Sequence, residues 1–311
     1  MNIFQNTLIL FTFLVVSISS VNANVYKWLD DNGKVHYGDR EIKGVQQKII
    51  DLKYTKSNWS EFNIVVKTKE VDLTPEETQK IISGVNNVYE FFNRVLFFDM
   101  YKTVPVNILV LKNVNSYNKY LTEKTGEKPT PSYGVYYRSD NQIVVYIQDD
   151  RELTFNTIKH EVAHAIIDSI VPYSPAWLNE GLAEQMETLT KHGDNLHVRR
   201  HKKNYYYARQ LDKNNRLIGI SEFLKMPSKK WRHSLSRGQA GLQSQSGEFV
   251  YFLLTTPPDR SFIVRLMHNF KRGDRTISYY LVGKNYIGGI KTLEIKWKNW
   301  LQSTSDNEVV L

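Results

Sequence analysis

Two histidines four residues apart are the first feature of this 311-residue chain that predicts chemistry. His160 and His164 lie in LTFNTIKHEVAHAIIDSI, and on an α-helix this spacing puts both imidazoles on one face, where they can bind one metal ion. The spacing fits tetrahedral zinc. Glu161 follows the first histidine and lies beside such a metal, where it can take a proton from metal-bound water. The alternative is an amphipathic helix with two exposed histidines and an ordinary Glu.

A second predicted helix, Leu178–Glu187, carries further carboxylates. Pro172 and Pro175 end the first helix and allow a turn before the second one. Glu180 and, one turn later, Glu184 lie on the same face of the second helix. Glu184 is equally compatible with an ordinary solvated helix surface.

This stretch resembles the gluzincin metallopeptidases, especially the peptidase-MA-like branch, in which HExxH is followed by a WLNEG-type helix. The resemblance implies a zincin-like fold, one Zn²⁺ ion per chain and hydrolysis of peptide bonds. It implies His160, His164 and Glu180 as zinc ligands and Glu161 as the general base. It also implies that Glu184 supports the site by orienting a ligating histidine.

The same resemblance points to a transition-state donor and a peptide-binding edge. Family members commonly carry a Tyr ahead of a helix that corresponds to residues 246–254, but Gln243 stands at about that position. Tyr251 is the substitute donor we favour and the cluster Tyr205–Tyr207 is another, although each also fits a packing role. The predicted hairpin Gly134–Ile147 is an edge to which an extended peptide can add as a strand, or an ordinary sheet hairpin.

The elements that must position these residues follow from hydrophobic periodicity and turn signals. Strands come first and helices afterwards, which predicts an α+β domain over residues 56–303. Thr74 begins the first helix, because TPEE offers an N-cap, an early Pro and early carboxylates. The expected elements are a strand through Phe62, Ile64 and Val66, a helix from about Thr74, a strand Val104–Leu111, a helix Val114–Leu121, strands Gly134–Arg138 and Gln142–Ile147, mainly helix from Leu153 onward, and a disordered tail over 304–311.

The N-terminus predicts export. Residues 1–23 are free of charged side chains and end in small residues, as a cleaved signal peptide does, and an uncleaved anchor is the alternative. Residues 24–55 predict a small hairpin around Asn32-Gly33, followed by a polar connector over 45–60. This run resembles a small domain of unknown function common in exported Gram-negative proteins and serves as an interaction module or a structural cap. We therefore expect a periplasmic or secreted protein without a transmembrane segment after cleavage.

The charge of the chain is concentrated in one segment. The formal net charge is +9, and residues 191–237 alone carry thirteen Lys and Arg against three acidic residues. This segment favours an acidic peptide or protein substrate or an anionic cell-envelope surface, whereas export argues against nucleic acid. A solvated helical surface is the plainer explanation. The absence of Cys excludes disulfides, thiol nucleophiles and Cys-ligated metals.

Two functions of different classes follow. The first is an exported zinc metallopeptidase, an endopeptidase or an aminopeptidase-like hydrolase, with Glu161 activating water. The alternative is a non-catalytic envelope-binding protein with a structural or vestigial zinc site. The intact Glu161 favours the first, and the Gln at position 243 favours the second.

Overall fold

In the computed structural model the chain divides into two units, residues 1–58 and 59–311. The structure describes residues 25–29, 35–38, 44, 46–50, 59–231, 241–304 and 308–311. The predicted signal peptide, residues 1–23, lies outside the described residues. Among the residues that the structure does describe, no helix is both long enough and apolar enough to span a bilayer.

The first unit contains a three-stranded antiparallel sheet in the order β2-β1-β3. Its strands are β1 (Val25–Leu29), β2 (Val35–Gly38) and β3 (Gln47–Ile50). Leu29 pairs with Val35, so the predicted hairpin is confirmed, although its Asn-Gly turn lies outside the described residues. The expectation of a polar connector from residue 45 was wrong at β3, which pairs with β1.

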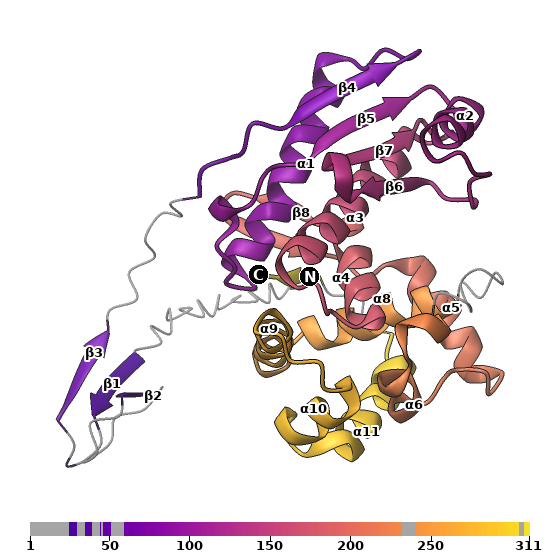
Figure 1. The fold of residues 1–311 in the computed structure, drawn as a ribbon. Coiled ribbons are helices and arrows are strands. Elements are labelled where there is room, and N and C mark those ends of the chain that lie inside the picture. The colour runs from indigo at the N-terminus through magenta and orange to yellow at the C-terminus, as the bar shows by residue number, and fades with distance from the viewer. Residues whose placement is uncertain are drawn as a thin grey trace, which may run out of the picture. The chain divides into compact units, whose positions relative to one another are not determined.

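The second unit contains a four-stranded sheet in the order β4-β5-β7-β6 (Figure 1). Strands β4 (Val65–Lys69), β5 (Asn107–Leu111) and β7 (Gln142–Tyr146) are parallel, whereas β6 (Gly134–Tyr137) runs antiparallel to β7. The mixed sheet and the many helices confirm the α+β prediction. Strand β4 begins at Val65, three residues after Phe62, where the sequence predicts it to start. The backbone N–H of Phe62 instead donates to the side chain of Asn86.

Alternation along β5 separates two hydrophobic cores. Ile108 and Val110 belong to the main core, which also contains the apolar faces of α1 (Pro75–Arg94) and α3 (Arg151–Ile170). Leu109 and Leu111 point to the other face of the sheet and pack with Tyr117 and Leu121 of α2 (Val114–Thr125). The sheet is therefore covered by helices on both faces.

Helix α1 begins where the capping residues in the sequence predict. The Thr74 hydroxyl accepts from the Glu77 N–H, and the Glu77 carboxylate accepts from the Thr74 N–H, which completes a capping box. Two orphan amide groups are satisfied in this way, and the helix begins at Pro75 as the sequence predicts.

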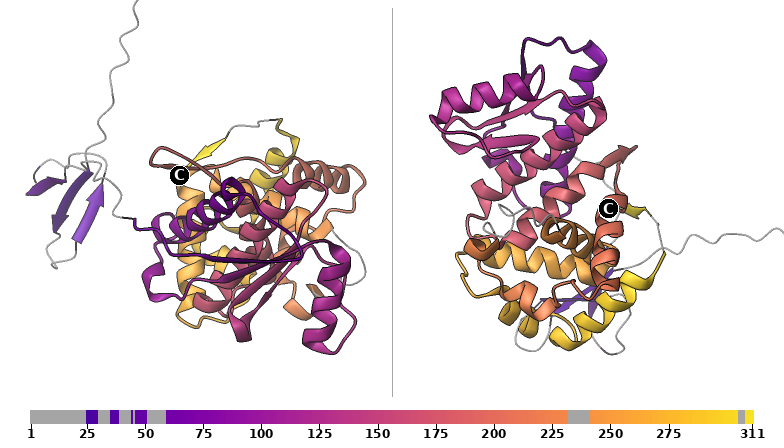
Figure 2. Two further views of the ribbon diagram at one scale, coloured as in Figure 1. Left: turned by 90° about the horizontal axis from the view of Figure 1, so that it is seen from above. Right: turned by 90° about the vertical axis from the view of Figure 1, so that its right-hand side faces the viewer.

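The rest of the unit is mostly helical and packs around α8 (Gly241–Leu254), of which twelve of fourteen residues are buried. Figures 1 and 2 show the sheet at one end of the unit and the later helices at the other, with α3 and α4 (Ala176–Thr188) between them. The remaining elements are η1 (Met100–Lys102), η2 (Arg138–Asp140), α5 (Lys202–Lys213), α6 (Ile220–Lys225), α9 (Pro257–Lys271), α10 (Ser278–Asn285) and α11 (Gly289–Gln302).

A second small sheet corrects two predictions. Strands β8 (Thr190–His192) and β9 (Asn195–Val198) form a hairpin within the part predicted as helical, and Gly193 has the positive φ of its turn. Strand β10 (Val309–Val310) pairs with β9. The prediction of a disordered tail over 304–311 was therefore wrong at its end. Arg199 forms an ion pair with Glu308 and His197 forms a hydrogen bond with it, which helps to explain why this end is fixed.

Candidate metal centre

Helix α3 carries the two histidines in its middle, away from frayed ends. Asp150 begins the helix by accepting a hydrogen bond from the Glu152 N–H. Ile158 and Val162 are fully buried on one side of α3, as their periodicity predicts. His160 is buried and His164 half-buried, and both belong to the predicted face.

Helix α4 brings a carboxylate to these histidines, and Gly181 sets how closely it packs. A Cβ atom at Gly181 would lie 2.8 Å from the Ser246 carbonyl oxygen of α8 and would also collide with the Val250 side chain. Only a glycine therefore permits this approach. The tight contact fixes α4, and with it the preceding Glu180, beside α3.

The predicted ligand atoms converge. The Nε2 atoms of His160 and His164 are 3.0 Å apart, and the Glu180 Oε2 atom lies 3.9 Å and 3.8 Å from them. All three residues can offer one ligand atom each within 4.8 Å of one another. The structure thus brings together the three residues that the sequence resemblance implied as ligands.

The outer nitrogens of both rings are already engaged. His160 Nδ1–H donates to Glu187 Oε1 at 2.9 Å, and His164 Nδ1–H donates to Asn179 Oδ1 at 2.8 Å. With Nδ1 protonated, a neutral imidazole keeps its lone pair on Nε2. Two such lone pairs then face each other beside the Glu180 carboxylate, an arrangement that is repulsive unless a proton or a cation lies between them.

This donor set fits zinc. Two imidazole nitrogens and one carboxylate oxygen are ligands that catalytic zinc sites use, and hydrogen bonds to the outer ring nitrogens are the usual support. Burial opposes protonation of His160, yet the hydrogen bond and charge of Glu187, with the charges of Glu184 and Glu161, raise its pKa to about 10. The negative surroundings that favour a proton there favour a divalent cation as well.

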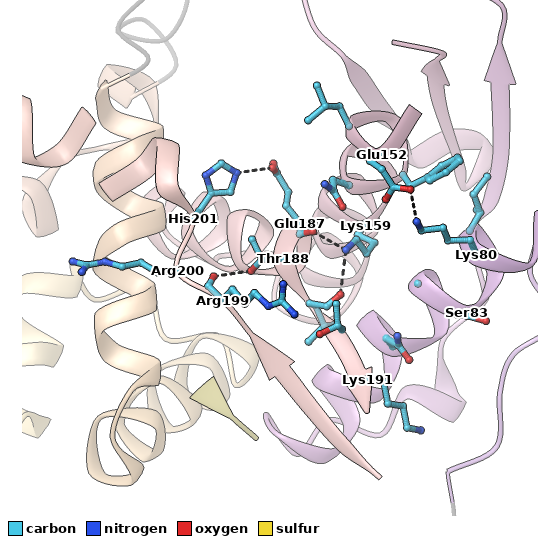
Figure 3. A pocket seen from close by; sticks show the side chains of 18 of the residues that line it. Lys80, Ser83, Glu152, Lys159, Glu187, Thr188, Lys191, Arg199, Arg200 and His201 are labelled. Carbon is cyan, nitrogen blue, oxygen red and sulfur yellow. Dashed lines mark hydrogen bonds and ion pairs between the residues drawn. The ribbon is translucent and has the colours of Figure 1, made fainter. Parts of the chain in front are cut away.

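Glu187, rather than the predicted Glu184, orients a histidine of the site. Its two carboxylate oxygens accept from different rings. Oε1 accepts from His160. Oε2 accepts from His201 Nε2 at 3.2 Å, as Figure 3 shows. Burial disfavours the charged form, but these hydrogen bonds outweigh it and hold the pKa of Glu187 below its usual range. Glu184 instead accepts from Asn204 Nδ2 at 2.6 Å. The hydrogen bond to His160 thus comes from Glu187, but Glu184 also lies close, with a carboxylate oxygen within 4.8 Å of ligand atoms of His160 and Glu187.

A cavity of about 850 Å³ opens beside the candidate metal ligands. His160, Glu161 and Glu187 line it, together with Gln243 of α8. The rest of the lining comes from α2, the loop after it and the ends of β6 and β7, and comprises Val114, Asn118, Thr122, Lys128, Pro129, Pro131, Ser132, Tyr133, Gly134 and Tyr146.

Strand β6 fixes the position of Glu161. A Cβ atom at Gly134 would lie 3.0 Å from Glu161 Cγ and 2.9 Å from Thr157 Cγ2, closer than ordinary van der Waals contact. The absence of a side chain at Gly134 therefore lets the edge strand lie directly against α3. β6 pairs only with β7 among the described residues, so its other edge borders this region unpaired.

The predicted tyrosine donors lie elsewhere. Tyr251 is 1% exposed, contacts the Trp300 ring and does not line the cavity. It faces the core because it belongs to the fully buried part of α8. Tyr205 donates to the Ser303 carbonyl and packs on the Arg200 guanidinium, whereas its neighbours Tyr206 and Tyr207 are exposed.

Three contributing residues were not predicted from the sequence. Glu187 lies seven residues after Glu180, on the same helical face, so the heptad spacing carried a usable signal. Asn179 directly precedes Glu180 in the WLNEG motif, so the motif itself pointed to this residue. His201 precedes α5 and reaches Glu187 only through the tertiary fold, so no local pattern could identify it.

The comparisons with known proteins concern the N-terminal part. Residues 12–58 match the family model of a domain of unknown function, DUF4124. A search of curated proteins gives no significant match. The family match ends before the unit with the histidine and glutamate cluster, so it carries no information on the chemistry there. Residues 12–58 therefore belong to a DUF4124 domain, a domain typical of exported Gram-negative proteins.

Proposed function

We propose that this protein is an exported zinc-dependent metallopeptidase whose residues 59–311 form a zincin-like peptidase domain. One observation carries the proposal: the Nε2 atoms of His160 and His164 and the Glu180 carboxylate converge while both Nδ1 atoms are held by acceptors. A chance HExxH on an amphipathic helix requires neither the third residue nor the outer hydrogen bonds. A periplasmic or secreted location accompanies the proposal.

The residues of the site have separable roles in peptide hydrolysis. A bound zinc ion supplies Lewis acidity toward water and a peptide carbonyl. Glu161, in the cavity wall, takes a proton from the attacking water and delivers it to the nitrogen of the leaving amine. Glu187 and Asn179 hold the two ligating rings in one tautomer. The unpaired edge of β6 offers backbone groups to an extended peptide.

The donor for the developing oxyanion changes from the sequence prediction. Gln243 lines the cavity with His160 and Glu161, and its amide can donate a hydrogen bond. It cannot donate a proton, because an amide is not an acid in this pH range. We therefore assign Glu161 all proton transfer and give Gln243 only the stabilisation of negative charge.

The alternative function is a non-catalytic envelope protein in which zinc only supports the fold. The experiment that separates the two compares purified wild type with Glu161→Gln on a broad peptide library, with metal analysis of both. Peptidase function predicts about one zinc per chain in both forms and hydrolysis by the wild type alone. Zinc in the wild type without cleavage of any peptide would favour the alternative. Equal cleavage by both forms would remove Glu161 from the mechanism.

A further inference from the structure

A second cavity, also of about 850 Å³, lies on the other side of Glu187 and is strongly basic. Glu187 lines both cavities, so a ligand here lies next to the support of the metal centre. Its wall combines parts of α1, α3, β8 and the start of α5 (Figure 3). The basic side chains in the lining are Lys80, Lys159, Lys191, Arg199, Arg200, Lys202 and Lys203, and the only acidic ones are Glu152 and Glu187.

Several of these cations already have carboxylate partners. Lys80 pairs with Glu152, and Lys191 pairs with Glu90 at 2.7 Å. Arg199 pairs with Glu308 at 2.9 Å, and Arg200 pairs with Glu248 in the core. Glu187 itself is occupied by two histidines, so it does not neutralise the remaining cations.

Three lysines are left without a carboxylate. Lys202 and Lys203 are exposed at the rim, and neither forms a salt bridge with any described residue. Lys159 is 9% exposed and donates to two backbone carbonyl oxygens, those of Glu187 at 2.6 Å and Leu189 at 3.1 Å. An ammonium has three N–H donors, so one remains for a ligand. The charges of Glu187 and Glu152 act on this ammonium, but neither carboxylate forms a salt bridge with it.

The lining of the cavity suits a peptide better than a bilayer surface. Ile81, Phe155 and Leu189 supply apolar lining between the cations, and Asn87 and Asn156 supply amides. Such a wall suits the carbon stems and main-chain groups of a peptide that bears carboxylates. A bilayer is flat and would not bring a head group to the buried Lys159.

We infer that this basic cavity binds acidic residues of the peptide that the neighbouring metal site cleaves. The inference rests on the proposed peptidase function and names its substrate class as peptides with Asp or Glu near the scissile bond. It also gives a local role to part of the basic segment 191–237, five of whose cations line the cavity. Four of the remaining eight, including Lys213 and Lys229, are lysines, and neither of these two contributes to the lining.

The test measures binding rather than turnover. Zinc-loaded, full-length Glu161→Gln protein is titrated with two fluorescent peptides of one sequence, one with Asp and Glu and the other with Asn and Gln at the same positions. The titrations are then repeated with the same protein that also carries the double substitution Lys202→Gln/Lys203→Gln. Its matched control is Lys213→Gln/Lys229→Gln, which removes the same charge from exposed positions outside the cavity.

The inference predicts tighter binding of the acidic peptide and a loss of roughly 5- to 20-fold in its affinity on the Lys202/Lys203 change at low salt. The neutral peptide and the control pair should change by less than about twofold. Equal binding of the two peptides, or equal loss in the control pair, would overturn it. Binding to vesicles that contain anionic lipid is measured with the same variants. If the Lys202/Lys203 change weakened only vesicle binding, the cavity would serve a membrane and the inference would be overturned. Peptide hydrolysis by the wild type is measured separately, so failure of the peptidase function remains distinguishable.

Discussion

The clearest test of the metal centre compares two glutamates one helical turn apart. Glu187 accepts from the outer nitrogen of His160 at 2.9 Å and from His201 at 3.2 Å, whereas Glu184 accepts from Asn204. Replacing Glu187 by Gln leaves one oxygen and puts an NH₂ donor where the second oxygen stood. One of the two histidine N–H groups then faces another donor. The ring of His160 loses its charged acceptor or its fixed orientation.

The size of the effect follows from that contact. A hydrogen bond to a charged acceptor is worth about 1.5–3 kcal/mol when it is buried. Loss of an outer partner of a metal-binding histidine typically costs about 10- to 100-fold in metal affinity, which corresponds to about 1.4–2.7 kcal/mol. We therefore expect Glu187→Gln to weaken zinc binding by 10- to 100-fold in competition with a fluorescent chelator.

Glu184→Gln is the matched control, because a Gln oxygen can still accept from Asn204. Burial and then the charge of Glu187 raise the pKa of Glu184, so a neutral side chain also relieves a cost at this position. Because the charge of Glu184 also favours a cation at His160, Glu184→Gln should lose some zinc affinity, but less than Glu187→Gln, and its thermal stability should not fall. A larger loss of zinc affinity in Glu184→Gln than in Glu187→Gln would refute this assignment of the outer carboxylate.

Two further predictions concern the edge strand and the metal itself. Gly134→Ala should lower kcat by about 10- to 100-fold while zinc content stays near one per chain, because the new Cβ displaces Glu161 but no ligand. Gly283→Ala, whose Cβ would make only a 3.7 Å contact with Ile290, is its control, and equal activity of both variants would contradict the contact argument. Zinc at about 100 times its Kd should stabilise the chelator-treated protein by about 2.7 kcal/mol, a rise of about 5–10 °C in Tm by scanning calorimetry. If zinc raised the Tm of His164→Ala by the same amount, the ion would bind elsewhere than at the proposed site.

Elements with a long apolar period or a capping signal were predictable from local sequence. The start of α1 follows from the Thr74 and Glu77 pair, and α3 follows from its buried stripe. Strands β8 and β10 were not predictable, because they contain three and two residues and exist through pairing with β9. Such short strands have too few residues to establish a period, and their pairing partners depend on the tertiary fold.

The convergence of the three candidate ligands was predictable because it depends on spacing, whereas the hydrogen bonds around them depend on side-chain direction. His160 and His164 share a face through helical geometry alone. Whether Glu184 or Glu187 meets His160 depends on how α4 is rotated against α3. Tyr251 failed as a donor for the same kind of reason, since its position on α8 turns it into the core.

The residues of the WLNEG segment meet separate physical requirements of the proposed site. Trp177 donates to Ser278 Oγ at 3.1 Å and packs on Phe249, which anchors the start of α4. Asn179 holds the ring of His164, and Glu180 faces both Nε2 atoms. Gly181 permits the close approach to α8. A helix that merely packed against α3 would need an anchor and a small residue. It would not need an amide on the outer nitrogen of one histidine and a carboxylate beside the inner nitrogens of two.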